Sequence, residues 1–237
     1  MNEYYNFSIS IIIPIFNEEK TILKILNKLQ FLKDFCSIEI VLVNDGSTDK
    51  SKDIIDQNKS LYTKVINLKK NYGKGKAVIE GLKNCSGDYL LVQDADLEYE
   101  PRDIIKFIEK IKNYSADLII GSRFIGSERS ILHFWHMVGN KFITILFNFL
   151  NNTTFSDIYC CYCLIKRNNI NLNKLKSFGW GQHAEILTYA VKNSSKIYEI
   201  GINYNARTYS EGKKIKYFNI FEVIFWIINT RLKSLIF

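Results

Sequence analysis

Residues 89–98 read Tyr-Leu-Leu-Val-Gln-Asp-Ala-Asp-Leu-Glu, and this stretch decides the fold. The short apolar run at 89–92 predicts a buried strand. The run stops at Gln93, and two carboxylates, Asp94 and Asp96, follow two residues apart. We therefore expect a strand whose carboxyl end leads into an acidic turn.

The same order of an apolar run and then polar residues recurs through the first 120 residues. Strands are predicted at 8–14, 38–43, 65–68, 89–92 and 118–120. Helices are predicted between them at 22–29, about 48–55, 77–82 and 101–111, with Asn17 and either Ser47 or Thr48 as N-caps. This alternation predicts an α/β fold with a mostly parallel sheet and helices on both faces. Such sheets bind ligands beyond the carboxyl ends of their strands.

The rest of the chain is less regular and more aromatic. Helices are predicted at 131–150, 183–191 and 218–237, and strands at 162–165 and 196–200. We expect one large domain over 1–216, with halves at about 1–125 and 126–216, and a helical C-terminal part over 217–237. The helices at 131–150 and 218–237 are either core helices or helices that lie on a membrane surface.

Composition narrows the class of protein. The chain has 237 residues, of which 47% are hydrophobic and 24% charged, which excludes disordered and low-complexity classes. Lys and Arg number 32 against 24 Asp and Glu, and residues 207–237 hold half of the resulting charge of +8. A basic end suits phosphate groups, an anionic membrane or nucleic acid. The five cysteines are expected to be reduced thiols, in a cytoplasmic protein that contacts the membrane face.

The acidic turn offers hard oxygen ligands. Carboxylates of this kind suit Mg²⁺ or Mn²⁺, and such ions usually also bind substrate phosphates. Glu98, two residues beyond Asp96, is a candidate third ligand. The same pattern also fits a solvated acidic turn with no ligand.

Two further strand ends carry polar residues. Asp45 follows the strand at 38–43 and can accept hydrogen bonds from a nucleobase or ribose, although a simple turn with a helix cap has the same pattern. Residues 71–77, Asn-Tyr-Gly-Lys-Gly-Lys-Ala, form a glycine-rich basic turn before a helix. Backbone N–H groups at such a helix start favour an anion. Lys74, in the same turn, is therefore a candidate for binding a phosphate group of a ligand.

Taken together, these segments resemble the inverting nucleotide-sugar glycosyltransferases of family two, with the GT-A fold, and most closely the dolichyl-phosphate mannose synthase-like branch. The stretches that carry the resemblance are Ile-Ile-Pro-Ile-Phe-Asn-Glu-Glu at 12–19, Val-Asn-Asp-Gly-Ser-Thr-Asp at 43–49, Gly-Lys-Gly-Lys-Ala at 73–77, Asp-Ala-Asp-Leu-Glu at 94–98 and Gly-Ser-Arg-Phe at 121–124. The resemblance is strong over 8–125 and looser to about 216.

The resemblance implies roles by position. The residues implied to bind the nucleotide sugar are Pro14, Phe16, Glu18, Asp45, Lys74, Gln93 and Asp94. Asp94, Asp96 and Glu98 are implied to hold Mg²⁺ or Mn²⁺ with the donor diphosphate. Arg123, Arg129, Arg207 and Lys213 are implied to bind the acceptor and the diphosphate. Asp96, Arg123 and Asp157 are the expected catalytic residues.

The type of acceptor decides whether a base is needed. The resemblance implies a polyprenyl phosphate acceptor at a membrane surface, and such a phosphate is already anionic at neutral pH. A glycan hydroxyl, as in cell-surface polysaccharide synthesis, would need a base, for which Asp157 is the first candidate and His183 and Glu185 are weaker ones. A non-enzymatic basic binding protein is the remaining alternative, and we expect no nucleic-acid partner because no motif for one is present.

Overall fold

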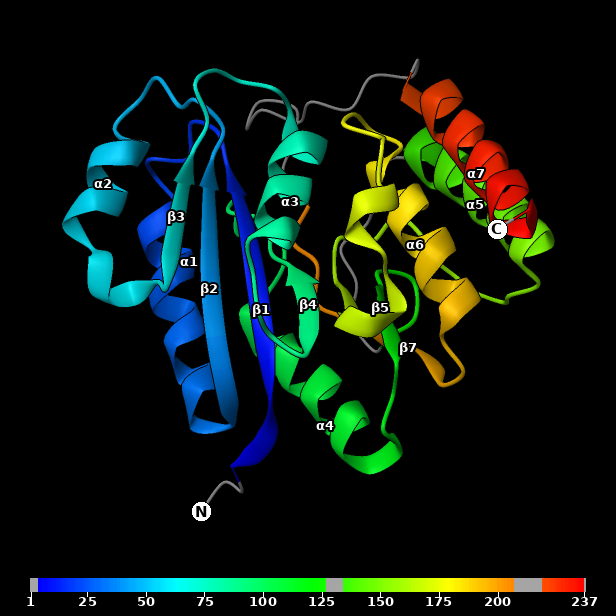
Figure 1. The fold of residues 1–237 in the computed structure, drawn as a ribbon, viewed down its shortest axis with the longest axis horizontal. Coiled ribbons are helices and arrows are strands. Elements are labelled where there is room, and N and C mark those ends of the chain that lie inside the picture. Colours follow the sequence, from blue (N-terminus) through cyan, green and yellow to red (C-terminus); the bar gives the residue numbers. More distant parts are fainter. Residues whose placement is uncertain (1–3, 127–133, 207–218, 237) are drawn as a thin grey trace.

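The computed structural model describes residues 4–126, 134–206 and 219–236. Within these residues, a seven-stranded sheet with the order β3-β2-β1-β4-β6-β5-β7 forms the centre of the molecule (Figure 1). The strands are β1 (Tyr5–Ile15), β2 (Cys36–Asn44), β3 (Lys64–Asn67), β4 (Tyr89–Val92), β5 (Leu118–Ser122), β6 (Cys163–Lys166) and β7 (Ile197–Gly201). Neighbouring strands are parallel except β6, which is antiparallel to β4 and β5. The predicted mostly parallel sheet is confirmed.

Helices cover both faces of this sheet (Figure 1). They are α1 (Ile22–Leu29), α2 (Ser51–Gln57), α3 (Lys74–Lys83), α4 (Ile104–Tyr114), α5 (Phe134–Asn151), α6 (Gln182–Asn193) and α7 (Asn219–Ile236). Pro101 opens a short 3-10 turn that leads into α4, as its fixed φ favours. Each of the predicted helices is present, and the described ends differ from the predicted ones by a few residues.

Alternate side chains of β1 pack into two hydrophobic cores, one on each face of the sheet. Ile9, Ile11 and Ile13 pack with α1 and α4 on one face of the sheet. Ile12 packs with α3 and α6 on the other face. All four are fully buried, and burial of one such side chain stabilises the fold by about 1.5–3 kcal/mol. Isoleucines follow one another at 11–13 in β1, without alternation, because both faces of the strand are covered.

The C-terminal helices belong to the second core. Phe147 of α5 and both Val223 and Ile227 of α7 are buried in it. The domain boundary predicted at 216 lies in the range 207–218, outside the described residues. None of the helices in the described part combines the length with the apolar character that crossing a bilayer requires.

The predicted helix caps are wrong. Thr21 occupies the N-cap of α1 and Lys50 that of α2, and neither makes a side-chain cap bond. Asn17 instead adopts a left-handed backbone, with φ of 57°, and its Oδ1 accepts a hydrogen bond from the N–H of Thr48 at 2.8 Å. The Oγ of Ser47 accepts one from the N–H of Asn17 at 3.1 Å. These polar residues connect the loops after β1 and β2 to each other at the carboxyl ends of the two strands.

Candidate active site

The topology gathers the polar strand ends at one edge of the sheet. Asp45, Asp94 and Arg123 follow the carboxyl ends of β2, β4 and β5. Because β6 runs the other way between β4 and β5, the residues before it reach the same edge. Asp157 is thereby brought next to Arg123. The fold thus places a candidate donor site and a candidate acceptor site side by side.

The turn after β4 is held in an uncommon conformation. Leu97 has a φ of 64°, which is rare for a residue with a branched side chain. The N–H of Glu98 donates to Asp96 Oδ1 at 3.1 Å, which closes the turn. Lys74 from the start of α3 places its Nζ 2.5 Å from Asp94 Oδ1. This edge of the turn therefore already attracts a cation.

Gln93 supports this turn from inside the core. Its side chain is fully buried, its Oε1 accepts from the hydroxyl of Tyr162 at 2.5 Å, and its Nε2 donates to the carbonyl of Asp94 at 3.0 Å. The structure places Gln93 beneath the acidic turn, and not at the open edge where direct contact with a donor was predicted.

The acidic turn fits a divalent cation that takes part of its coordination from a ligand. Carboxylate oxygens are the donors that Mg²⁺ and Mn²⁺ prefer. In the described part of the chain, no three His, Cys, Asp or Glu side chains lie close enough to hold a metal by themselves. Glu98 Oε2 instead accepts from the hydroxyl of Tyr204 at 2.6 Å. Asp94 and Asp96 fit such an ion best if donor phosphates complete its coordination.

The candidate nucleoside site is ordered by Asp45. This carboxylate is buried and accepts from the backbone N–H groups of Tyr72 and Gly73, both at 2.8 Å. Gly46 must be glycine, because its φ is 66° and an added Cβ would lie 2.5 Å from the backbone of Lys70. Asp45 therefore fixes the glycine-rich loop against the end of β2.

The other predicted nucleoside residues line the same edge. Pro14 and Phe16 are partly exposed at the end of β1. Glu18 is partly exposed as well, and its Oε2 accepts from the hydroxyl of Thr21 at 2.7 Å. Pro14, Phe16 and Glu18 lie at the end of β1 or just after it, and β1 lies between β2 and β4, so these residues share the sheet edge with Asp45 and the acidic turn.

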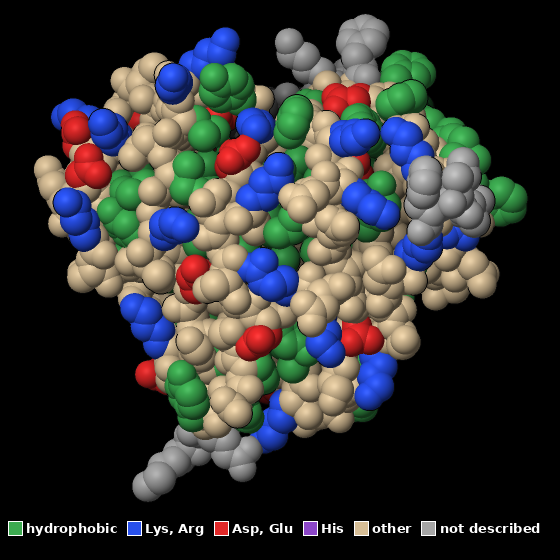
Figure 2. Space-filling model, in the orientation of Figure 1, with side chains coloured by type: hydrophobic (Ala, Val, Ile, Leu, Met, Phe, Trp, Pro, Cys, Tyr) green, Lys and Arg blue, Asp and Glu red, His purple; other side chains and the backbone are tan. Residues whose placement is uncertain are grey.

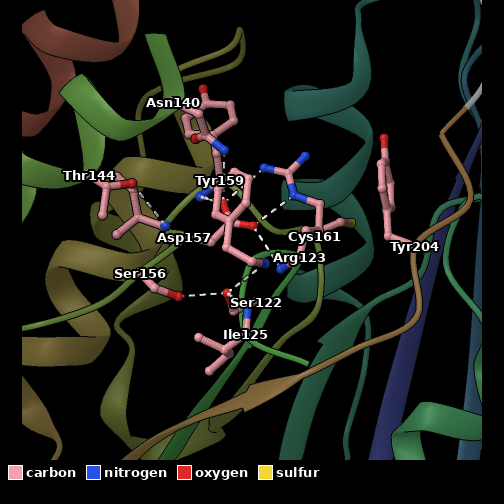
Figure 3. A network of polar contacts seen from close by, with 12 residues as sticks. Ser122, Arg123, Ile125, Asn140, Thr144, Ser156, Asp157, Tyr159, Cys161 and Tyr204 are labelled. Carbon is pink, nitrogen blue, oxygen red and sulfur yellow. Dashed lines mark hydrogen bonds and ion pairs between the residues drawn. The ribbon is translucent and has the colours of Figure 1, made fainter. Parts of the chain in front are cut away.

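The candidate acceptor site contains an ion pair between Arg123 and Asp157 (Figure 3). Arg123 Nε donates to Asp157 Oδ2 at 2.7 Å and its Nη2 donates to Oδ1 at 2.9 Å, a two-pronged contact. Asp157 is fully buried and also accepts from Asn140 Nδ2 of α5 at 3.0 Å. Burial alone would raise the pKa of Asp157, but the Arg123 guanidinium holds it below its usual value.

Two tyrosines missed by the sequence analysis connect the two halves of the site. Tyr204 binds Glu98 through its hydroxyl, and its ring lies 5.3 Å from the guanidinium carbon of Arg123. Tyr99 packs against Tyr204 with ring centroids 5.1 Å apart. Tyr204 lies 106 residues from Glu98, so no local pattern could reveal the contact.

Three predicted acceptor residues, Arg129, Arg207 and Lys213, lie outside the described residues. The two weaker base candidates are placed inside the fold. Glu185 is buried, and its carboxylate accepts from the N–H groups of Lys176 and Ser177. It therefore orders the loop before α6.

His183 is the other weaker base candidate. It packs on Tyr159, and its Nε2 is buried with no hydrogen-bond partner among the described residues. Burial, reinforced by nearby Lys74, lowers the pKa of His183 to about 4.

Replacing His183 by glutamine tests this burial through the pH dependence of stability. The unfolded chain takes up a proton near pH 6.5, whereas folded His183 stays neutral down to about pH 4, so the folded state loses stability as the pH falls between these values. We expect the unfolding free energy of the wild type, relative to His183→Gln, to fall by on the order of 3 kcal/mol from pH 7 to pH 4. Urea denaturation at each pH measures it. A flat difference would show that His183 protonates freely in the folded state.

Comparison with known proteins identifies the family. The profile described as Glycosyl transferase family 2 matches residues 10–171. The chain belongs to glycosyl transferase family 2. An uncharacterized protein of Methanocaldococcus jannaschii is 30% identical to this family 2 chain over 220 residues, which cover 86% of the chain and 93% of that protein. The dolichol-phosphate mannosyltransferase of Pyrococcus furiosus is 39% identical over 118 residues, 49% of the chain. The family 2 chain spans only 33% of that relative in this match.

The fold of this family 2 chain is shared with solved enzymes. Glucosyl-3-phosphoglycerate synthase from Mycobacterium tuberculosis, solved with Mn²⁺, uridine diphosphate and phosphoglyceric acid, matches with a TM-score of 0.69 and 17% identity. The match covers 96% of this chain and 78% of that one. The predicted GT-A fold is confirmed.

Proposed function

We propose that this family 2 chain transfers a sugar from a nucleoside-diphosphate sugar to the phosphate of a polyprenyl phosphate, with inversion at the anomeric carbon. The proposal is supported chiefly by the surroundings of Asp157, which make it a poor base. This aspartate, the first candidate for a base, is fully buried, paired in two-pronged fashion with Arg123, and lowered in pKa. A hydroxyl acceptor needs a base that takes its proton, and a carboxylate held in this way is a poor one. A phosphate acceptor needs no base.

The reaction follows from this difference. A phosphate oxygen of the acceptor forms a bond to the anomeric carbon, and the bond from that carbon to the diphosphate breaks, with both electrons leaving on the nucleoside diphosphate. No proton is transferred, because the acceptor phosphate is already anionic near neutral pH. Arg123, oriented by its two hydrogen bonds to Asp157, would bind phosphate oxygens of the acceptor.

The donor side has its own residues. Asp45 and the glycine-rich loop would hold the nucleoside, and Lys74 would turn from Asp94 to a donor phosphate. A bound Mg²⁺ or Mn²⁺ at Asp94 and Asp96 would supply positive charge that stabilises the departing diphosphate. The Mn²⁺ and uridine diphosphate bound to the mycobacterial synthase, and the dolichol-phosphate acceptor in the name of the Pyrococcus relative, support the choice of donor and acceptor.

A comparison of two acceptors tests the proposal. Radiolabelled uridine- and guanosine-diphosphate sugars are incubated with the chain, Mn²⁺ and either a detergent-solubilised polyprenyl phosphate or the matching polyprenol, which lacks only the phosphate. We expect label in the organic phase with the phosphate and at least about a hundredfold less with the alcohol, because the alcohol needs a base. Equal transfer to both acceptors would favour the hydroxyl mechanism instead.

A further inference from the structure

Helices α5 and α7 are apolar on the side that faces solvent as well as on the side that faces the core. On α5 the exposed side chains recur at helical spacing: Phe134, Val138, Phe142, Ile145 and Phe149. Phe149, in the last turn of α5, is 83% exposed. The opposite face of α5 is buried. A water-facing helix would carry polar residues on this outer face.

Helix α7 repeats the pattern. Phe221, Phe225, Ile228 and Leu232 are exposed at positions i, i+4, i+7 and i+11. The two helices pack against each other, so their outer faces form one surface, which we call the α5–α7 face. Figure 2 shows hydrophobic side chains along the upper right rim of the molecule, where Figure 1 places these helices. Contiguous apolar surface of this kind marks an interaction site.

The charges on these helices favour an anionic partner. Lys141 of α5 and both Arg231 and Lys233 of α7 are basic, and Glu222 is the single acidic residue of the two helices. Glu222 faces inward, where its Oε1 accepts from the N–H of Gly181 at 3.3 Å. An apolar face with basic neighbours suits the boundary between lipid headgroups and acyl chains.

Aromatic residues support the same partner. Trp135, at the start of α5, is 71% exposed, and tryptophan is enriched where proteins meet the membrane–water boundary. The chain has three tryptophans in all, and the other two, Trp180 and Trp226, lie in the loop before α6 and in α7. Trp226 packs so closely on Gly181 that a Cβ there would meet its ring.

The α5–α7 face is physically continuous with the candidate active site. Asn140, on α5, donates to Asp157 at 3.0 Å, so one helix carries both a site contact and the apolar outer face. An α-helix with its side chains is about 10–12 Å across. A surface that lies on the outside of α5 is therefore one helix diameter from the Arg123–Asp157 pair.

We propose that the α5–α7 face docks on an anionic lipid bilayer and so holds the Arg123–Asp157 pair about one helix diameter from the membrane surface. The inference rests on the proposed function for the identity of the lipid acceptor, but the docking itself needs no acceptor. An anionic bilayer suits this face better than a second copy of the chain does, because a second copy would bring the basic side chains of these helices near one another.

Vesicle flotation tests the docking directly. The full chain is mixed with vesicles of phosphatidylcholine containing phosphatidylglycerol and without any polyprenyl phosphate. Ile145→Glu/Phe149→Glu is expected to lower the fraction bound by about tenfold or more, since two exposed apolar side chains that would enter the bilayer are replaced by charged ones. The matched control Leu23→Glu/Tyr114→Glu introduces the same charges at exposed positions of α1 and α4 and should bind as the wild type does. Equal loss in both variants, or no binding by the wild type, would overturn the proposal.

Tryptophan quenching provides a second test, in which the wild type itself reports the docking. Vesicles that carry brominated acyl chains should quench the emission of the wild type, because Trp135 would lie in the boundary region. Absence of quenching together with a concentration-dependent dimer in sedimentation, lost in Ile145→Glu/Phe149→Glu, would assign the face to a second copy of the chain and overturn the proposal.

Failure of the docking and failure of the proposed function are separable. Detergent-solubilised polyprenyl phosphate needs no docking, so the Ile145→Glu/Phe149→Glu variant should glycosylate it at the wild-type rate. Normal transfer without vesicle binding in the wild type would reject the docking alone. Vesicle binding without transfer to any polyprenyl phosphate would reject the function alone.

Discussion

Replacing Asp157 by alanine is expected to lower the free energy of unfolding by about 3–5 kcal/mol. The Arg123 side chain is only 14% exposed, and its Nε and Nη2 both donate to Asp157. Removal of the carboxylate leaves a buried positive charge without its counter-charge, which costs more than the pair itself contributes. Urea denaturation at pH 7 measures the loss, read from the midpoint at constant slope.

A surface ion pair provides the matched control. Lys76 and Glu80 lie 2.5 Å apart on α3, four residues from each other, and both side chains are partly exposed. Glu80→Ala should cost no more than about 0.5 kcal/mol. In Arg123→Met/Asp157→Ala the loss should be clearly smaller than the sum of the two single losses, because the double variant leaves no charge unpaired. An Asp157→Ala loss below about 1 kcal/mol would show that Arg123 reaches solvent or another partner.

The variant Asp157→Asn separates positioning from proton transfer. Asparagine keeps the shape of the side chain and one acceptor oxygen but cannot take up a proton at neutral pH. If Asp157 only positions Arg123, the variant should still transfer sugar to polyprenyl phosphate, with a raised KM for the acceptor. Complete loss of transfer with normal donor binding would identify Asp157 as a base and favour a hydroxyl acceptor.

Much of the fold could be predicted because its signals are local. The run at 89–92 coincides with β4, and the isoleucines of β1 are apolar on both faces because helices cover both. Strand ends are also local, so Asp45, Asp94 and Arg123 could be assigned to one edge before any contact was known.

The contacts within the site could not be predicted, because they join distant parts of the chain. Arg123 meets Asp157 only because β6 is inserted between β4 and β5 in the antiparallel direction. The predicted caps failed for the same reason, since Asn17 finds partners 30 and 31 residues away that outcompete its own helix. Sequence patterns identify polar residues at turns but do not show which residues they bond.

Replacing Asp94 or Asp96 by asparagine is expected to lower the rate of sugar transfer by at least about a thousandfold, close to what the loss of one strong transition-state contact costs elsewhere. Each substitution removes a negative charge from the turn that would hold the divalent cation, and so removes charge compensation for the departing diphosphate. Asp53→Asn, the same change at an exposed position of α2, is the matched control and should leave transfer unchanged.

Binding measurements connect this loss to the cation. Titration calorimetry with uridine or guanosine diphosphate should show binding that requires Mn²⁺ or Mg²⁺ and disappears with a chelator. Mn²⁺ alone should bind weakly, because two carboxylates leave most of its coordination to water and Lys74 already lies 2.5 Å from Asp94 Oδ1. Cation and nucleotide should therefore bind cooperatively, each strengthening the other by the same factor.

Lys74→Met should change the binding of the cation and of the nucleotide in opposite directions. Without the ammonium group, Asp94 loses its competing cation, so Mn²⁺ alone should bind more tightly than it does to the wild type. The nucleoside diphosphate should bind less tightly, because Lys74 no longer reaches a phosphate. Donor binding that ignored chelator and survived both aspartate substitutions would show that the Asp94–Asp96 turn holds no metal. The acidic turn would then act through Lys74 alone, as an anchor for the start of α3.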